Sequence, residues 1–229
     1  ELIDSLKSAY SIGVDVAQAT FVLLNELFAK EGLLVLQPDL SSLKNSMKSI
    51  FKDDLLHGTP SSIVAETNKK LEENYSLQVN ARPINLFYLR DQIRNSIDKR
   101  GNVYSVDGTT IRFTEKEILD ELNEFPDRFS PNVILRGLYQ ETILPNIAFI
   151  GGGSEVAYWM QLKALFNHYQ VPFPVLVLRN SFIVMNSKQE HKMDELGISI
   201  SDLFKDETVL ANEMVVKWAD KPLSLEGEV

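Results

Sequence analysis

The chain has 229 residues, 44% hydrophobic and 24% charged, which is ample material for one large α/β domain or two smaller ones. With 23 basic and 32 acidic residues its net charge is -9. A nucleic-acid partner is not expected, because such proteins normally carry a basic stripe. The lack of cysteine excludes a disulfide framework or a thiolate site within this chain. No apolar run approaches the roughly 20 residues of a membrane helix, no signal-peptide pattern appears, and the composition fits a reducing cytoplasm.

The first part of the chain has a helical pattern. Residues 13–31 carry apolar side chains on two adjoining helical rows and predict a mostly buried helix. The run LLVL at 33–36 predicts a short interior parallel strand. Because Glu1 already lies in a helical pattern and the sequence stops at an uncapped Gly-Glu-Val, we expect a piece of a longer protein.

Local signals in the middle of the chain predict a small β element and a helix. Residues 85–89 (NLFYL) predict a strand, and Asp107-Gly108 predicts a hairpin between residues 102–106 and 110–113. Thr114 and Glu117 form a capping box at the start of the next helix. We therefore expect three regions: residues 1–80, mostly helical and packed on the core; residues 81–128, a connection with the hairpin and a helix; and residues 129–229, a βαβ portion with C-terminal helices.

The stretch 129–181 has the order helix, buried strand, glycine turn, helix, buried strand. The first helix is expected to begin at Ser130-Pro131, and the two strands at 147–150 and 175–178. A right-handed crossover would make these strands parallel. Ligands of such sheets bind outside the carboxyl ends of the strands. The pattern therefore predicts an α/β domain with a polar pocket at the glycine turn.

The glycine turn consists of Gly151, Gly152, Gly153 and Ser154. Three glycines permit a sharp turn and close approach of a ligand, Ser154 can cap the following helix, and the N–H groups there favour phosphate or carboxylate. The turn is neither a GxGxxG motif nor a P-loop. The glycines could equally serve the tight turn alone. Glu155 is favoured by the helix dipole, and it could also act as an acid, a base or an ammonium ligand.

Polar side chains also gather on one face of the preceding helix. Arg136, Tyr139 and Gln140 are spaced i, i+3, i+4, and Glu141 is adjacent. A guanidinium fork, a phenol and an amide suit a carboxylate or sugar ligand. The alternative is an exposed face on which Arg136 pairs with Glu141.

The remaining aromatic and histidine residues give weaker signals. Tyr158 and Trp159 could line a pocket, although their spacing is also typical of core residues. The three histidines, His57, His168 and His191, are scattered without metal-binding spacing, so no metal site is expected. No GxSxG motif is present, which disfavours an α/β-hydrolase.

Several blocks resemble the bacillithiol biosynthesis cysteine-adding enzymes, a family of cysteine ligases. The main block is SPNVILRGLYQETILPNIAFIGGGSEVAYWMQLKALF, and VPFPVLVLRNS follows it. NLFYLRDQIR and GISISDLF add support. Many relatives carry proline-glycine where this chain has Gly153-Ser154, which leaves the turn possible and alters its rigidity.

The resemblance implies a Rossmann-like three-layer parallel sheet, with a helical insertion region and a small β-hairpin, related in shape to class I aminoacyl-tRNA synthetases. It implies an enzyme that joins the carboxyl group of cysteine to the amine of glucosaminyl malate. Family members are longer, with a nucleotide motif upstream and a coiled coil downstream that pairs subunits. We therefore expect the central-to-late region of a cytoplasmic homodimer, inactive as this chain alone. The alternative function is a non-catalytic nucleotide- or sugar-binding module.

The resemblance also assigns site residues in three groups. Catalytic candidates, which would position the attacking amine, are Glu141 and Glu155. Substrate-binding candidates are Arg136, Tyr139, Gln140, Tyr158, Arg179, Asn180 and Ser181. Cofactor-binding candidates are Gly151, Gly152, Gly153 and Ser154, with ATP or ADP implied by analogy. Which ligand sits at the glycine turn stays open, because the upstream motif would hold much of a nucleotide.

Overall fold

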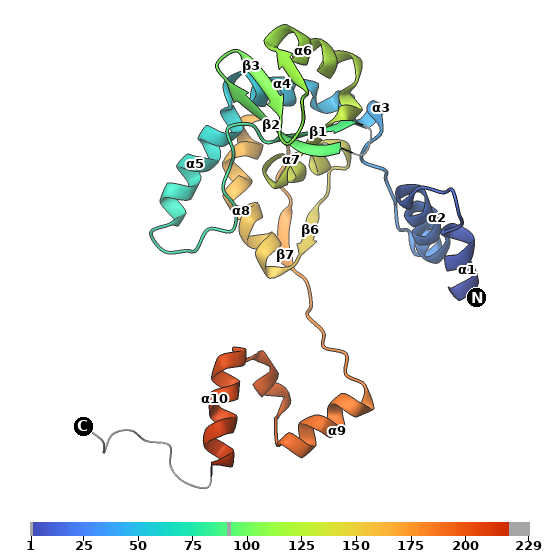
Figure 1. The fold of residues 1–229 in the computed structure, drawn as a ribbon, viewed down its shortest axis with the longest axis vertical. Coiled ribbons are helices and arrows are strands. Elements are labelled where there is room, and N and C mark those ends of the chain that lie inside the picture. Colours follow the sequence, from blue (N-terminus) through green and yellow to red (C-terminus); the bar gives the residue numbers. More distant parts are fainter. Residues whose placement is uncertain (1, 91–92, 220–229) are drawn as a thin grey trace. The chain divides into compact units, whose positions relative to one another are not determined.

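The computed structural model describes residues 2–90 and 93–219, which fall into two compact units, Glu1–Arg179 and Asn180–Val229 (Figure 1). None of the described helices is long and apolar enough to cross a membrane. The three regions expected from the sequence, with boundaries after residues 80 and 128, stay a prediction of domain organisation.

The first unit begins with two helices packed on each other. They are α1 (Leu2–Ala9) and α2 (Val16–Phe28), followed by the 3-10 turn η1 (Ala29–Glu31). Asp15 caps α2, where its carboxylate accepts a hydrogen bond from the Gln18 N–H at 2.9 Å. The helix was predicted correctly but its burial was not, because Ala19 is its one buried residue and Val16 is 72% exposed.

Residues 33–36 form no strand, so the prediction of an interior parallel strand there was wrong. A strand needs a partner for its backbone N–H and C=O groups. The LLVL run has the composition of a strand but none of the described strands pairs with it. Leu34 is instead 62% exposed.

A helical layer follows, built from α3 (Ser41–Lys44), η2 (Asn45–Met47), α4 (Lys48–His57) and α5 (Thr59–Leu71). Gly58, at φ 61°, ends α4 in the left-handed conformation and lets α5 start at once, with Pro60 in its first turn. Asp54 on α4 is buried and accepts hydrogen bonds from the N–H and the side-chain amide of Asn85, at 2.6 and 3.0 Å. These bonds fix the chain segment that enters the sheet.

The larger sheet is antiparallel, with the strand order β4-β3-β2-β1-β5. Its strands are β1 (Leu86–Arg90), β2 (Ile93–Arg100), β3 (Val103–Val106), β4 (Arg112–Thr114) and β5 (Phe129–Pro131). The predicted strand at 85–89 and the Asp107-Gly108 hairpin are confirmed, with Gly108 at φ 65°. Strand β2 was not predicted, because its residues IRNSIDKR are mostly polar.

The capping box was also predicted correctly. Thr114 and Glu117 exchange hydrogen bonds at the start of α6 (Glu115–Glu124), and the turn η3 (Pro126–Arg128) follows. The helix expected from Ser130-Pro131 begins later. Those residues belong to β5, and Asn132 caps α7 (Val133–Ile143) by accepting from the Ile134 N–H.

A parallel βαβ unit completes the first compact unit. It consists of β6 (Ala148–Gly151), α8 (Gly153–His168) and β7 (Val175–Leu178), with Ala148 opposite Val175 and Ile150 opposite Val177. This confirms the expected crossover and the mixed α/β class. The three-layer parallel sheet was wrong in extent, because the described parallel strands are one pair. The larger sheet is antiparallel, since β1 pairs antiparallel with both β2 and β5.

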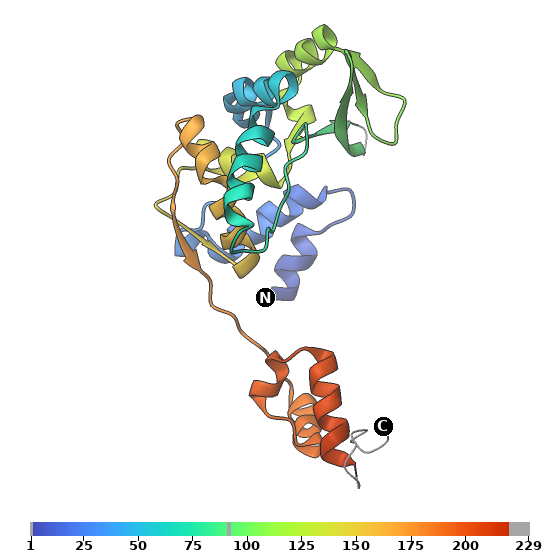
Figure 2. The same cartoon turned by 90° about the vertical axis from the view of Figure 1, so that its left-hand side faces the viewer.

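The core of this unit lies where α4, α6, α7 and α8 meet the sheets, with α5 running alongside α8 (Figure 1 and Figure 2). Trp159 of α8 stacks on Phe149 of β6 at 4.1 Å between ring centroids, and it contacts Phe166 and Phe173. Gly137 lets α7 approach, since a Cβ there would lie 3.1 Å from the Trp159 ring. The tryptophan therefore joins α7 to the βαβ unit.

The second unit contains α9 (Ser187–Leu196), η4 (Ile200–Phe204) and α10 (Glu207–Trp218). Asn186 and Asp206 cap the two helices, and Gly197, at φ 63°, ends α9 in the left-handed conformation. Lys205 pairs with Asp202 and Glu213 at 2.8 and 2.5 Å. The predicted helix stop at Pro222 lies outside the described residues.

Candidate functional site

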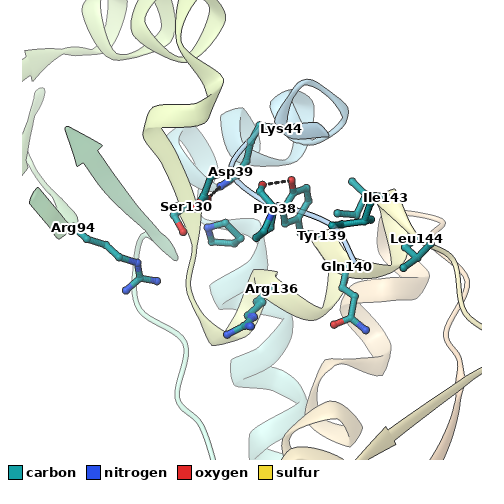
Figure 3. A pocket seen from close by; sticks show the side chains of 12 residues that line it. Pro38, Asp39, Lys44, Arg94, Ser130, Arg136, Tyr139, Gln140, Ile143 and Leu144 are labelled. Atoms are coloured by element: carbon teal, nitrogen blue, oxygen red, sulfur yellow. Dashed lines mark hydrogen bonds and ion pairs between the residues drawn. The ribbon is translucent and has the colours of Figure 1, made fainter. Parts of the chain in front are cut away.

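A pocket of about 330 Å³ lies beside α7 (Figure 3). Four parts of the chain line it: the 33–40 segment, α3, β2 and the β5–α7 region. Its volume is within the range of about 300–1,000 Å³ that small-molecule sites occupy. One end carries the guanidinium groups of Arg94 and Arg136, and the other carries the apolar side chains of Ile143 and Leu144 (Figure 3). A ligand with an acidic end and a less polar end would fit this distribution.

The 33–40 segment is fixed to the pocket by two side chains. The Tyr139 hydroxyl donates a hydrogen bond to the Pro38 carbonyl at 2.5 Å. The Lys44 ammonium donates to the Phe129 carbonyl at 2.7 Å and lies 3.2 Å from an Asp39 carboxylate oxygen. These contacts hold residues far apart in the sequence in one wall of the pocket.

Burial shifts the pKa values of Lys44 and Tyr139 in opposite directions. Burial lowers the pKa of Lys44, whose side chain is 1% exposed, although the nearby Asp39 carboxylate opposes this effect. Burial, with a smaller contribution from Asp39, raises the pKa of Tyr139 to about 12. Tyr139 therefore stays a neutral hydrogen-bond donor at neutral pH, and it is unsuited to act as a general base there.

Within the described residues, the two arginines differ from Lys44 in having no carboxylate partner. Among residues 2–90 and 93–219, no ion pair joins Arg94 or Arg136 to an acidic side chain. The Arg94 guanidinium lies 4.2 Å from the centre of the Phe87 ring, a cation–π contact that leaves its N–H groups available. Two guanidinium groups that no described carboxylate neutralises, in a protein of net charge -9, make this pocket suited to an anion.

The predicted polar face of α7 is divided by the structure. Arg136, Tyr139 and Gln140 line the pocket. Glu141 is buried, where its carboxylate accepts from the backbone N–H of Asn146 at 2.8 Å and from its side-chain amide at 2.9 Å. The alternative pairing of Arg136 with Glu141 is therefore not present, and Glu141 stabilises the turn between α7 and β6.

The glycine turn is filled by the chain's own side chains. The Glu155 carboxylate accepts a hydrogen bond from the Gly152 N–H at 2.8 Å. The backbone N–H of Arg179 donates to the Gly151 carbonyl at 2.8 Å. A Cβ on Gly152 would lie 3.1 Å from Nε of Arg179. The φ of Gly152 is -68°, so the glycine is needed for space rather than for its backbone angle. The cap that was expected from Ser154 comes instead from Glu155, because α8 begins one residue before Ser154.

Tyr158 and Arg179, two other predicted site residues, are not among the residues that line the α7 pocket. Tyr158 is half-buried against the core. Arg179 lies against the glycine turn at the end of β7. Asn180 and Ser181 are exposed and belong to the second compact unit.

Comparison with known proteins shows which family these residues belong to. A family model described as "Bacillithiol biosynthesis BshC, N-terminal Rossmann-like domain" matches residues 1–180. The chain belongs to the BshC family. The matched domain is the N-terminal one of that family, whereas the sequence predicted a central-to-late position.

The curated relatives of the BshC family that match this chain carry the name "Putative cysteine ligase BshC". The protein of Flavobacterium psychrophilum is 44% identical over 206 residues, which cover 90% of this chain and 39% of the relative. The protein of Cytophaga hutchinsonii is 37% identical over 224 residues, covering 97% and 43%. The protein of Salinibacter ruber is 32% identical over 210 residues, covering 90% and 38%. The chain thus spans about 40% of the length of these BshC proteins.

Sequence reasoning missed three polar groups of the pocket in this BshC chain: Asp39, Lys44 and Arg94. Arg94 lies within the NLFYLRDQIR block that supported the resemblance, so a signal was present. Asp39 precedes α3 and Lys44 is its last residue, positions at which an acidic and a basic side chain are ordinary. Among the described residues, no cluster of histidine, aspartate and glutamate could hold a metal ion.

Proposed function

We propose that this chain is part of a carbon–nitrogen ligase that adds cysteine to glucosaminyl malate in bacillithiol biosynthesis. Membership of the BshC family and the name of its relatives support the reaction class. Because the chain spans about 40% of those relatives, the activity is proposed for the full-length protein and not for these residues alone.

We place the acidic end of the acceptor in the α7 pocket. The observation that carries this placement is the guanidinium of Arg136, which lines the pocket and has no carboxylate partner among the described residues. A carboxylate of the malate group would supply that partner through two parallel N–H···O bonds. Gln140 and the Ser130 hydroxyl, which also line the pocket, offer neutral hydrogen bonds to hydroxyl groups of the acceptor.

Between the two carboxylates predicted to act in catalysis, Glu155 is the better candidate. Its side chain is exposed at the start of α8, while Glu141 is buried and already accepts two bonds from Asn146. Amide formation needs a deprotonated amine, and a carboxylate can orient or deprotonate it. Glu155 would then have to exchange its bond to the Gly152 N–H for one to the substrate.

Nucleotide binding stays a proposal based on analogy. Amide formation from a carboxylate requires activation of that carboxyl group, and ATP is the activator that the analogy suggests. The glycine turn would accept a phosphate only if Glu155 released the Gly152 N–H. Pairing of subunits through a coiled coil is likewise a proposal for the full-length protein.

The test is to incubate the full-length protein with cysteine, glucosaminyl malate and ATP and to detect the amide product by mass spectrometry. Product formation would support the ligase. Saturable binding of nucleotide or amino sugar without product would instead favour a non-catalytic binding module. Residue-level support would come from substrate protection of Arg136 against a guanidine-specific reagent.

A further inference from the structure

The α7 pocket holds a second arginine that the proposed function does not yet use. Arg94 comes from β2 and Arg136 from α7, and their guanidinium groups point toward one another across the end of the pocket (Figure 3). They reach this position from elements more than 30 residues apart along the chain, so the fold alone brings them together. Two like charges facing one another repel, and a ligand with negative charge removes that repulsion.

The charge of this end of the pocket exceeds what one carboxylate neutralises. Lys44 is matched by Asp39 at 3.2 Å. Arg94 and Arg136 have no such partner among the described residues and leave two positive charges. A monocarboxylate bound at Arg136 would therefore leave one guanidinium unmatched, whereas a ligand with two acidic groups would match both.

Arg94 is also held in place before any ligand arrives. Its guanidinium stacks 4.2 Å from the centre of the Phe87 ring on β1. Arg94 pairs with Leu89 across the β1–β2 ladder, which fixes its backbone. A side chain already ordered loses little conformational freedom on binding, so its contact can contribute to discrimination between ligands.

We propose that Arg94 is a specificity-determining residue that binds the second acidic group of a dicarboxylate whose first carboxylate is bound by Arg136. This inference rests on the proposed function of the pocket, and it adds the residue that distinguishes two acidic groups from one. Arg136 would contribute equally to mono- and dicarboxylates, while Arg94 would contribute to dicarboxylates alone.

The experiment compares malate with lactate, which share the 2-hydroxy acid and differ in the second carboxylate. Binding of each to the full-length protein is measured by titration calorimetry for the wild type, Arg94→Gln, Arg94→Lys and Arg136→Ala. Arg100→Gln is the matched control, since Arg100 is an exposed arginine at the other end of the same strand. Thermal melting checks that each variant is folded.

The wild type and Arg100→Gln are expected to bind malate more tightly than lactate. Arg94→Gln should lose about tenfold or more of its malate affinity, the effect of one charge-assisted pair, and keep its lactate affinity. Arg94→Lys should keep part of the preference, because it retains the charge without the planar fork. Arg136→Ala should weaken both ligands.

Two results would overturn the inference, and they differ in what else they overturn. If the wild type prefers malate and Arg94→Gln keeps that preference, or weakens both ligands equally, the role of Arg94 is wrong and the proposed acid site at Arg136 stands. If the wild type binds neither ligand, the acid site itself is wrong.

Discussion

The α7 pocket and the glycine turn at the start of α8 both have an arginine beside groups that could bind an anion, but these groups differ in whether the chain itself already occupies them. At the turn, Glu155 accepts the Gly152 N–H and Arg179 lies against Gly152. In the pocket, Arg94 and Arg136 have no carboxylate partner within the described part of the chain. The backbone N–H at the glycine turn is thus already bonded to a carboxylate of the chain, whereas the two pocket guanidinium groups have no such partner among the described residues.

The largest effect is expected at Lys44, the pocket cation whose interactions are satisfied within the protein. Lys44→Met would keep the side-chain length but leave the Phe129 carbonyl and Asp39 without their partner. We expect the free energy of unfolding in urea to fall by about 3 kcal/mol. Lys52→Met, an exposed change on the neighbouring helix α4, should leave it within about 0.5 kcal/mol. Equal stability of both variants would show that Lys44 is not part of a paired network.

A direct comparison of the two regions comes from their exposed arginines. Arg136→Ala should lower kcat/KM for the acceptor in the full-length protein by about 100-fold, roughly 2.8 kcal/mol of lost binding to a charged group. Arg179→Ala should lower it less than about tenfold, because Arg179 lies against a turn whose N–H is already bonded to Glu155. The reverse order would place the acceptor site at the glycine turn. Both side chains are exposed, so melting temperatures should not change.

A smaller effect on the free energy of unfolding is expected from Asp54, a carboxylate that is buried, unlike the exposed Glu155. Burial raises the pKa of Asp54 from 3.8 to about 6, while hydrogen bonds from Asn85 oppose the rise. Because the folded pKa lies above the unfolded one, the stabilisation from this group is complete below the unfolded value and is lost as the pH rises through about 6.

The free energy of unfolding should therefore fall by roughly 1 to 2 kcal/mol from this group between pH 5 and pH 7.5. Urea unfolding of the wild type and of Asp54→Asn at both values measures it. The variant is less stable overall, because an amide cannot accept both bonds from Asn85, and it should lack this pH-dependent component. An identical pH dependence in the two proteins would contradict the raised pKa.

The smallest effect is expected at Tyr139. Tyr139→Phe removes one hydrogen bond to the Pro38 carbonyl and should lower the free energy of unfolding by about 1 kcal/mol, with a modest rise in KM as the 33–40 segment loosens. Tyr75→Phe, at a side chain 70% exposed, is the control and should be neutral. A large loss of kcat in Tyr139→Phe without a change in stability would instead indicate a chemical role for the hydroxyl.

The elements that the sequence predicted well depend on short-range signals. The capping box of Thr114 and Glu117, the Asp107-Gly108 hairpin and the glycine turn between β6 and α8 each involve a few consecutive residues. The strand expected at 33–36 and the wide parallel sheet failed, because strand pairing depends on distant partners. The polar strand β2 was missed for the same reason, since it is defined by pairing with β1 and β3.

The candidate site likewise has residues that local spacing predicted and residues that only the fold brings to the pocket. The spacing of Arg136, Tyr139 and Gln140 was sufficient to predict one face of α7, because helical periodicity is local. The same spacing could not show that Glu141 is bonded to Asn146, or that Arg94 reaches the pocket from a strand. Each of those facts depends on a turn or a sheet that forms only in the folded chain.

By itself the sequence determined most of the helices, the capping box of Thr114 and Glu117, the βαβ unit and the family resemblance, because these follow from local propensity and from ordered blocks of residues. The tertiary structure alone decided that Arg94, Lys44 and Asp39 line one pocket with Arg136. The physical reason is that the charge at a site depends on which side chains the fold brings within a few ångströms. Partners as distant along the chain as Lys44 and Phe129 have no local signature.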